Sequence, residues 1–497
     1  MAKKIAIIGS GISGLSAAAY AAKQGHEVYV FEKNDIPGGR ARQFTTPNGY
    51  TFDMGPSWYW MPDIIDRFFA DFGYKICDFY KLVSLQPQFD VLFPDRTLSM
   101  PSRIEDMYAL FEEIEPGSGP RLEAFLKAAK YKYEVGMQQF VYKPCLSWWE
   151  FVRPRIALSA LRLNLFSNFR DYVARYFSHP QLRTLMEFPV IFLGASPQQI
   201  PALYSLMNYG GYALGTWYPM GGFYELIKAM HHIAMAQGAR FYFNHNVEQI
   251  KVKQGKVHTL LINGEDWHFD AVIASSDYHH TESLIEAPYR NYSEQYWDKK
   301  VFAPSCLIFY LGFKERIPGL RHHTLFFEHD LDDHIHSIYT DKQWPDKPLF
   351  YACCPSVTDT SVAPEGHENL FLLMPLAPGL NDEEKTRARY LDEMLQRIEL
   401  HTGAQDLKAR LDYQRSYCVR DFVHDYNAYK GNAYGLANTL GQTAVLKPSI
   451  RNKKLSNLFY TGQLTVPGPG VPPSIISGKI VAGELHNLKA EPHETAI

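Results

Sequence analysis

A glycine-rich turn near the N-terminus constrains the fold of this chain more than any other stretch. Lys4 to Ile8 is a short apolar run typical of a buried parallel strand, and it leads directly into Gly9, Gly11 and Gly14 in the spacing G-x-G-x-x-G. The first glycine of this pattern permits a tight turn, the second lets a pyrophosphate approach the backbone, and the third lets a helix pack against the strand. The sequence therefore predicts a strand, a turn and a helix arranged to bind a dinucleotide.

The next residues complete this pattern. Ser13 to Gln24 is rich in alanine and favours a helix, whose first turn directs free backbone N–H groups and a positive dipole end at phosphates. A second strand begins at Glu27 and ends at Glu32, where a carboxylate can accept hydrogen bonds from ribose hydroxyls. Because all parts occur in order, we predict an adenine dinucleotide site; a purely structural glycine turn is the alternative.

Composition limits the other classes of function. A net charge of −3 over 497 residues, without runs of like charge, gives no electrostatic case for nucleic acid. A chain of this length is expected to form roughly two or three domains. Six cysteines without a C-x-x-C pair favour a reduced compartment, and we expect no signal peptide, since the first strand begins at Lys4. We also expect no transmembrane helix, since no run of about 18 uncharged apolar residues occurs.

Three further turns have the composition of ligand-binding loops. Pro37 to Arg40 joins a Pro-Gly-Gly turn to a guanidinium that can pair with a diphosphate; a plain turn with a surface arginine is the alternative. Gly55-Pro56-Ser57 follows a strand-like run and lets backbone approach a flat ring. Near the C-terminus a strand reaches Gly462, and a helix begins around Pro472, where its first turn can stabilise negative charge on a reduced flavin.

The middle of the chain has different patterns. Pro62 to Tyr142 looks helical throughout and is typical of an inserted domain. A strand, a β-meander and a second strand between 239 and 277 indicate a return to the nucleotide-binding domain. Pro304 to Lys408 mixes strands with one helix, so we expect a sheet there that carries a substrate cavity.

In order and spacing, these motifs resemble those of the bacterial-type phytoene desaturases, FAD-dependent carotenoid desaturases in the amine oxidase-like flavoprotein superfamily. The resemblance covers essentially the whole chain and includes Pro219 to Gly222 and the segment Gly462 to Ser477. It implies an α/β fold, with a Rossmann-type, glutathione reductase-like FAD-binding domain and an inserted α+β region that binds substrate and membrane. We expect the FAD-binding domain to comprise 1–75, 220–282 and 445–490, the inserted region 76–219 and 283–444, and a tail 491–497.

The resemblance also assigns contacts to FAD. The residues implied for its diphosphate are Gly9, Ser10, Gly11, Ser13 and Gly14, with Glu32 and Arg40 at the ribose and diphosphate and Val247 at the adenine. The residues implied near the flavin ring are Gly55, Pro56, Ser57, Gly462, Val471 and Pro472. The implied reaction removes two hydrogens from adjacent carbons of phytoene, a hydrophobic C40 carotenoid, with a hydride passing to flavin N5 and oxygen or a quinone as final electron acceptor.

The segment Leu146 to Phe177 interleaves aromatic and arginine residues. Such a segment suits a membrane interface with anionic lipid, and a helix pair packed on its own domain is an equal alternative. Glu150 and Arg153 are candidates for the acid–base pair, because an ionisable pair among aromatic residues is perturbed by desolvation; a surface ion pair is the alternative. We expect a cytoplasmic protein bound peripherally to the inner face of the cell membrane.

The remaining alternatives concern metals and other reactions. The paired histidines, such as His322-His323, lack separated third and fourth ligands, and adjacent side chains on a strand point apart, so we expect no metal. A hydroxycarotenoid 3,4-desaturase or a diapophytoene-type desaturase is the second interpretation of the substrate. A flavin amine oxidase with an aromatic cage and a prenyl-binding escort protein without flavin are more distant, and the intact glycine pattern disfavours the escort.

Overall fold

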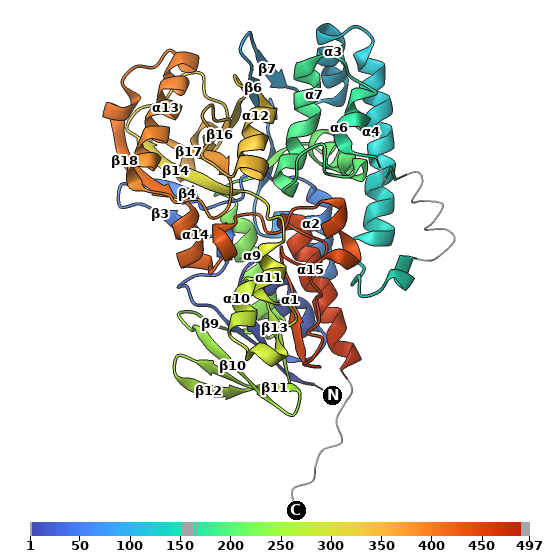
Figure 1. Ribbon diagram of the computed structural model, residues 1–497. Coiled ribbons are helices and arrows are strands. Elements are labelled where there is room, and N and C mark those ends of the chain that lie inside the picture. Colours follow the sequence, from blue (N-terminus) through green and yellow to red (C-terminus); the bar gives the residue numbers. More distant parts are fainter. Residues whose placement is uncertain (1, 152–162, 165–166, 489–497) are drawn as a thin grey trace, which may run out of the picture.

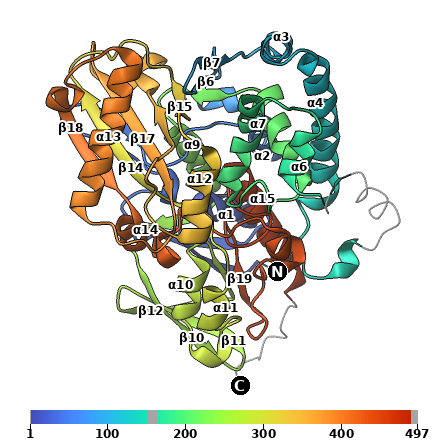
Figure 2. The same cartoon turned by 45° about the horizontal axis from the view of Figure 1, so that its top comes forward.

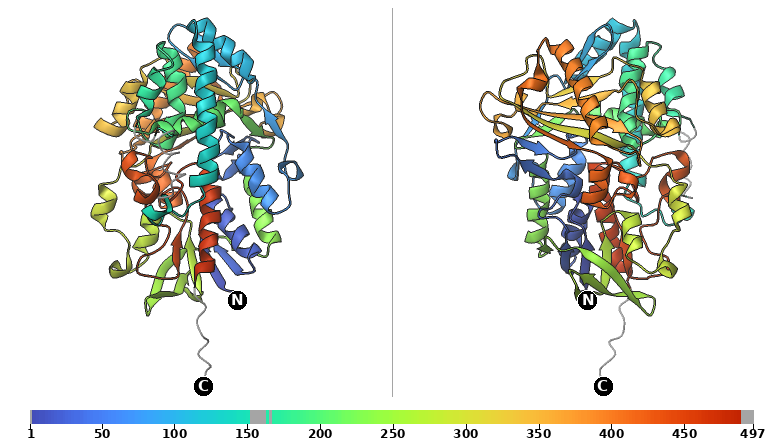
Figure 3. Two further views of the ribbon diagram at one scale, coloured as in Figure 1. Left: turned by 90° about the vertical axis from the view of Figure 1, so that its right-hand side faces the viewer. Right: turned by 60° about the vertical axis from the view of Figure 1, so that its left-hand side comes forward.

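The computed structural model describes residues 2–151, 163–164 and 167–488. Arg153 and the predicted tail 491–497 lie outside these ranges. The described chain forms three parts (Figure 1): a parallel sheet with its helices near the N-terminus, a second sheet at the upper left, and a group of helices at the upper right. The two views of Figure 3 show the second sheet and the helical group at the end of the molecule far from the N-terminus.

The predicted strand, glycine turn, helix and strand are confirmed. They form the centre of a parallel five-stranded sheet in the order β19-β13-β1-β2-β9. Its strands are β1 (Lys4–Ile8), β2 (Glu27–Phe31), β9 (Arg240–Tyr242), β13 (Ala271–Ala274) and β19 (Leu458–Tyr460). Its main helices are α1 (Ile12–Lys23), α9 (Tyr224–Ala236) and α15 (Val471–Glu484), and α1 packs closely against both of the others. The first and last parts of the described chain thus share one sheet.

The predicted meander follows β9. It is an antiparallel three-stranded sheet of β10 (Val247–Lys253), β11 (Lys256–Ile262) and β12 (Glu265–His268). Val247, at the start of β10, pairs with Ile262 and is buried. The start of β10 lies near the carboxyl end of β2, because β9 pairs with β2 and the His245 N–H, two residues before Val247, donates to the Glu32 carbonyl oxygen at 2.8 Å.

The second sheet has seven strands in the order β18-β14-β17-β16-β15-β6-β7. Its strands are β14 (Ser305–Phe313), β15 (His323–Phe326), β16 (Phe350–Cys353), β17 (Glu368–Leu376), β18 (Leu411–Tyr417), β6 (Phe89–Leu92) and β7 (Thr97–Met100). Helix α13 (Glu384–Thr402) covers one face (Figure 2). Leu391 and Leu395 of this helix belong to the same buried cluster as Phe309 and Leu372 of the sheet. The opposite face of this sheet is directed toward the interior of the molecule.

The prediction of a helical pattern throughout Pro62 to Tyr142 is wrong for its middle. Helix α2 (Pro62–Asp71) is followed by the short strand β5 (Leu82–Ser84) and by the hairpin of β6 and β7. The physical reason is a distant partner: β6 pairs in parallel with β15, more than two hundred residues later. Helices return at α3 (Ile104–Ile114) and α4 (Ser118–Val135).

The aromatic and arginine segment is divided between core and surface. In α6 (Phe169–Ala174) and just after it, Phe169, Tyr172 and Phe177 are buried, so for these three residues the packed alternative is correct. Arg170 pairs with Glu187 at the end of α7 (Pro180–Glu187). At the other end of the segment Trp149 is 80% exposed. In the described part of the chain, no helix has the length and apolarity needed to cross a membrane.

Candidate active site

One cavity of about 860 Å³ lies where the three parts of the molecule meet. Its wall at the five-stranded sheet contains the glycine turn and the carboxyl end of β2. The opposite wall contains Ile308, Tyr351 and Leu373 from the seven-stranded sheet, and Met137 and Leu206 from the helical part. The cavity therefore joins a dinucleotide-type turn to a predominantly apolar chamber.

The glycine turn is built as its spacing predicts. Gly9 has φ +94°, a left-handed conformation that favours glycine. A methyl group on Gly14 would lie 2.2 Å from the Gly9 carbonyl oxygen, so only glycine lets α1 pack this close to the end of β1. Gly11 borders the cavity, and a methyl group there would meet no atom within 4 Å. Gly11 thus leaves room for a ligand to reach the backbone.

The acid at the end of β2 is held in place by hydrogen bonds. Glu32 is buried, and its Oε2 accepts from the Ser10 backbone N–H and from the Ser10 hydroxyl, each at 2.9 Å. Its Oε1 accepts from the Asn34 backbone N–H at 3.0 Å. Glu32 also lines the cavity, so its carboxylate is oriented beside the space where the predicted ribose would lie.

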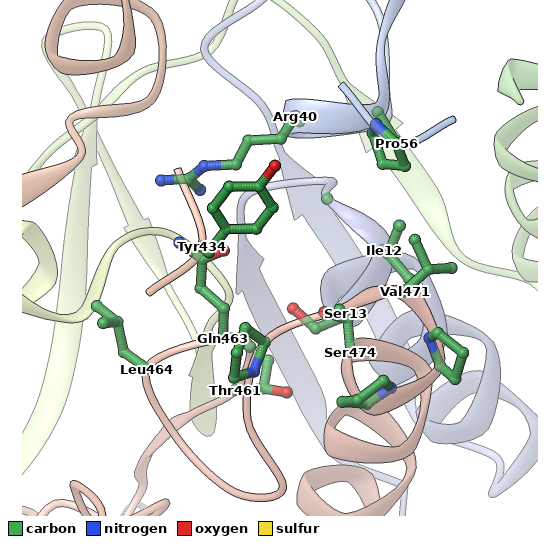
Figure 4. A pocket seen from close by; sticks show the side chains of 18 of the residues that line it. Ile12, Ser13, Arg40, Pro56, Tyr434, Thr461, Gln463, Leu464, Val471 and Ser474 are labelled. Carbon is green, nitrogen blue, oxygen red and sulfur yellow. The ribbon is translucent and has the colours of Figure 1, made fainter. Parts of the chain in front are cut away.

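Arg40 supplies a partly buried positive charge to the same cavity. One terminal nitrogen donates to the Asn432 carbonyl oxygen at 3.1 Å, whereas Nε has no hydrogen-bond partner and no carboxylate pairs with the guanidinium among the described residues. Burial lowers the pKa of Arg40. A guanidinium whose Nε is buried without a partner is unfavourable unless an anion accepts its hydrogen bonds, so this site fits a diphosphate. Figure 4 shows Arg40 at one side of the pocket, close to Tyr434.

A helix terminus completes the wall. Helix α15 begins at Val471, directly after Gly470 with φ +112°. Its first residues face the pocket beside Ile12 and Ser13, as Figure 4 shows. Gly462 has φ +110°, and its N–H donates to Ser477 Oγ at 3.0 Å. The free N–H groups at this helix start are suited to negative charge on a flat ring system.

Most of the predicted cofactor residues border this cavity. They are Gly9, Gly11, Ser13, Glu32, Arg40, Gly55, Pro56, Ser57, Val247, Gly462, Val471 and Pro472. Ser10 and Gly14 lie behind the wall, where one orients Glu32 and the other lets α1 pack. Other wall residues, such as Asn34, Ser275 and Tyr434, were not predicted individually. The strand predicted to end at Asp277 could have indicated that Ser275 lies near the cofactor, but no sequence pattern indicated Tyr434.

Of the proposed acid–base pair, only Glu150 is described. Its carboxylate accepts hydrogen bonds from the backbone N–H groups of Cys145, Leu146 and Ser147, at 3.1, 2.6 and 3.1 Å. Cys145 borders the cavity, and Glu150 is not among the residues that line it. Glu150 therefore holds the fold of its own loop, and the acid–base role of Glu150 and Arg153 stays a prediction.

The expectation that the paired histidines lack a third ligand is wrong at one place. His322, His323 and Cys353 are all buried and offer ligand atoms within 4.8 Å of one another. The reason is strand pairing, since Cys353 on β16 lies directly opposite His323 on β15. A fourth protein ligand is not found among the described residues of this group.

Comparisons with known proteins agree with this geometry. The family model of the flavin containing amine oxidoreductases matches residues 12–486. The chain is 39% identical to a carotenoid 3,4-desaturase of Haloarcula japonica, over 97% of both chains. It is 31% identical to a zeta-carotene-forming phytoene desaturase of Myxococcus xanthus, over 97% of this chain and 94% of the relative.

A solved structure supports the fold. Cyclohexylamine oxidase from Brevibacterium oxydans superimposes with a TM-score of 0.61 at 16% identity and covers 98% of this chain and 100% of its own. The predicted α/β fold with a Rossmann-type domain is thereby confirmed, and the escort-protein alternative is excluded by the family match. The chain belongs to the flavin-containing amine oxidoreductases and, within them, to the carotenoid desaturases, FAD-dependent oxidoreductases that act on CH–CH bonds.

Proposed function

We propose that this chain is a phytoene desaturase that introduces C=C bonds on the way to neurosporene or lycopene. The observation that carries the proposal is the continuity of the cavity. Its cofactor end passes, without a dividing wall, into a chamber lined by Trp58, Trp60, Met61 and Ile64. An apolar chamber next to a flavin site fits a substrate that has no charged group to bind.

For the cofactor we propose an extended FAD along the wall described above. Gly9, Gly11 and Ser13 would contact the diphosphate together with Arg40, while Ser10 and Gly14 shape the turn behind them. Glu32 would bind the ribose and Val247 the adenine. The flavin ring would lie between the Gly55-Pro56-Ser57 turn and the segment that contains Gly462, Val471 and Pro472.

The bound FAD supplies a hydride acceptor for the reaction. The residues of this chain contribute alignment and exclusion of water. Tyr59 and Trp60 are buried beside the chamber, and Trp60 Nε1 donates to Thr216 Oγ1 at 2.8 Å, which fixes the ring. Rigid aromatic walls hold a long polyene in one position, so that adjacent C–H bonds face the same site.

A second candidate function is 3,4-desaturation of a hydroxycarotenoid. It is favoured by the higher identity to the Haloarcula japonica relative, 39% against 31% for the phytoene desaturase. The two reactions need the same cofactor site and the same apolar chamber, and they differ in where along the polyene the flavin acts. A diapophytoene-type reaction on a shorter polyene is the third variant of this chemistry.

The test is to express the chain in bacterial hosts that accumulate phytoene, a hydroxylated acyclic carotenoid or diapophytoene, and to record absorption spectra of the extracted pigments. Each added double bond moves the polyene bands to longer wavelength. We expect coloured, multi-banded products in the phytoene host. Colourless extracts there, with a shifted spectrum in one of the other hosts, would assign the protein to that substrate instead.

We further propose that the protein takes its substrate from a membrane surface. Leu440 and Leu446 are 51% and 41% exposed and also line the cavity, so the chamber reaches the surface at an apolar rim. Exposed Trp149 and Leu146 follow Cys145, another wall residue. An aromatic and aliphatic rim of this kind suits the lipid interface. The final electron acceptor in this proposal is a membrane quinone or oxygen.

Liposome flotation tests the membrane proposal. We expect the Trp149→Ser and Leu440→Ser double variant to bind anionic liposomes more weakly than the wild type at low salt. Leu400→Ser is the matched control, since Leu400 is 85% exposed on α13 and does not line the cavity. Equal flotation of all three proteins would refute this rim as the contact surface.

A further inference from the structure

Three buried side chains meet where β15 begins. His322, His323 and Cys353 offer ligand atoms that lie within 4.8 Å of one another, and each of these residues is at most 5% exposed. None of the three lines the reaction cavity. The group therefore has no part in the contacts to FAD and substrate described above, and its chemistry needs a separate explanation.

The hydrogen bonds of His323 determine which of its nitrogens is available. The Tyr351 hydroxyl donates to Ser57 Oγ at 2.9 Å, so its oxygen accepts from His323 Nδ1–H at 2.6 Å. In the neutral ring Nε2 then carries a lone pair, and this buried nitrogen has no hydrogen-bond partner among the described residues. A charged ring would bury an N–H group without an acceptor, which costs more free energy.

His322 has the same arrangement. Its Nδ1 lies 2.8 Å from Thr358 Oγ1, and its Nε2 is buried without a hydrogen-bond partner in the described chain. By contrast, another buried histidine, His334, uses both ring nitrogens, since Nδ1 accepts from the Leu349 N–H and Nε2 donates to the Pro375 carbonyl oxygen. Histidines that bind metal ions typically hold their second nitrogen by a hydrogen bond of this kind. The two rings are thus oriented as metal ligands are.

The third ligand comes from the neighbouring strand. Cys353 on β16 pairs directly with His323 on β15, so the thiol and the imidazole lie on the same face of the sheet. A second cavity, of about 20 Å³, is bordered by His322, Cys353 and Asp53. A cavity of this size holds about one water molecule, which is the usual fourth ligand where a protein supplies three. The acidic residue Asp53 in its wall favours a cation over an anion.

We propose that His322, His323 and Cys353 bind one zinc ion, with a water molecule as the fourth ligand. Two imidazoles and one thiolate suit Zn²⁺, which has no redox chemistry of its own. On binding, the Cys353 thiol releases its proton to solvent, and its sulfur becomes the anionic ligand. The ion joins β15 to β16 next to Gly55 and Ser57, which border both cavities. Its role is to hold the turn that we place beside the flavin ring, whatever the substrate.

The proposal is tested on the full-length, FAD-loaded protein. Bound metal is removed with a chelator, and Zn²⁺ is then added in a titration calorimeter. We expect one zinc ion per chain with a Kd below about 1 µM. Thr358→Val removes the hydrogen-bond partner of His322 Nδ1 and is expected to raise this Kd by about 10–100-fold. Cys353→Ser and His322→Gln each remove a ligand, so we expect a rise of more than about 100-fold.

Cys354→Ser is the matched control. Cys354 is as deeply buried as Cys353 and adjacent to it, but it belongs to the hydrophobic cluster beneath α13, on the other face of the sheet. Its variant is expected to bind zinc as tightly as the wild type. Zinc is also expected to raise the midpoint of thermal unfolding of the wild type and of Cys354→Ser, but not that of Cys353→Ser.

Cobalt gives a readout on the wild type alone, which does not depend on how well any variant folds. Co²⁺ is added to the metal-free protein in place of zinc, and difference spectra are recorded against the same protein without cobalt. We expect the bands of tetrahedral Co²⁺ at wavelengths longer than the flavin bands, together with a sulfur-to-cobalt charge-transfer band at shorter wavelength. Added Zn²⁺ should remove both.

Three results would overturn the inference. The first is a wild type that binds neither Zn²⁺ nor Co²⁺. The second is zinc binding that is equally tight in Cys353→Ser and His322→Gln, because the ion would then lie elsewhere. The third is a cobalt spectrum without the sulfur band. None of these measurements uses a carotenoid, so a protein that binds zinc here but desaturates no carotenoid would contradict the proposed function alone, and coloured products without zinc binding would contradict this inference alone.

Discussion

Adding one methyl group at either of two glycines in the same turn is expected to affect different properties: Gly14→Ala should lower the stability of the fold, and Gly11→Ala should weaken FAD binding. In Gly14→Ala the new carbon would lie 2.2 Å from the Gly9 carbonyl oxygen and 2.9 Å from Ser275 Oγ. Since C···O contacts are normally about 3.3 Å or longer, the start of α1 has to move by about 1 Å. Overpacking of this kind costs about 1–3 kcal/mol. The closest atom is backbone, so we expect a loss near the upper end, about 3 kcal/mol.

In Gly11→Ala the methyl group meets no atom within 4 Å, and the backbone there has φ −66°, which any residue adopts. The free energy of unfolding is therefore expected to change by less than about 0.5 kcal/mol. The methyl group points into space that we assign to the FAD diphosphate. Forcing the ligand away from the backbone is expected to raise the Kd for FAD by about 10–100-fold, which corresponds to about 1.4–2.8 kcal/mol.

The assay compares both variants with the wild type by two measurements. Urea unfolding of the FAD-free proteins, followed by circular dichroism, gives the free energy of unfolding. Titration with FAD, followed by quenching of flavin fluorescence, gives the Kd. If Gly14→Ala were as stable as Gly11→Ala, the close contact between α1 and Gly9 would be refuted. If Gly11→Ala bound FAD as tightly as the wild type, the diphosphate would not lie at this turn.

Three other results are expected. Arg40→Leu removes a partly buried charge that has no carboxylate partner among the described residues, so the FAD-free protein should not lose stability, whereas the Kd for FAD should rise at least tenfold in the same titration. Lys447 is buried without a hydrogen-bond partner in the described chain, and burial lowers its pKa to about 7. Between pH 7 and about pH 10 the unfolded chain therefore binds more protons than the native state, so the free energy of unfolding of the wild type should rise with pH. In Lys447→Met this rise between pH 7 and pH 10 should be smaller by roughly 4 kcal/mol, as measured by urea unfolding at the two pH values. Glu150→Gln should destabilise the loop 145–150 more than it slows turnover, since Glu150 binds three backbone N–H groups; limited proteolysis measures the first and flavin reduction the second.

The parts of the fold that sequence could predict are those whose partners are near in the chain. The strand, turn, helix and strand from Lys4 to Glu32 are local, because each element packs on the next. Gly14 could be assigned from spacing alone, since its neighbour Gly9 is five residues away. Helix α13 and the strands β14 and β17 also agree with the predicted mixture of strands and one helix between Pro304 and Lys408, because their apolar patterns are long.

The parts that sequence could not predict depend on distant partners. β6 is a strand because β15 pairs with it, and neither sequence alone indicates the pairing. His322, His323 and Cys353 meet for the same reason, although adjacent histidines suggested side chains that diverge. The hydrogen bond from the Tyr351 hydroxyl to Ser57 Oγ joins residues 294 positions apart. Reaction chambers of this kind are assembled by tertiary structure, so their residues carry no common spacing.

The placement of β19 and α15 beside β1 and α1 has a consequence for how the protein is made in the cell. The turn at Gly9 is synthesised first, and the helix start at Val471 that faces it across the pocket is synthesised more than four hundred residues later. A nascent chain on the ribosome therefore cannot hold the flavin end of the cofactor, even after the seven-stranded sheet has left the exit tunnel. Complete binding of FAD is therefore expected only after translation, and the full binding energy then stabilises only chains that were completed. Truncated products would stay colourless and become substrates for proteases.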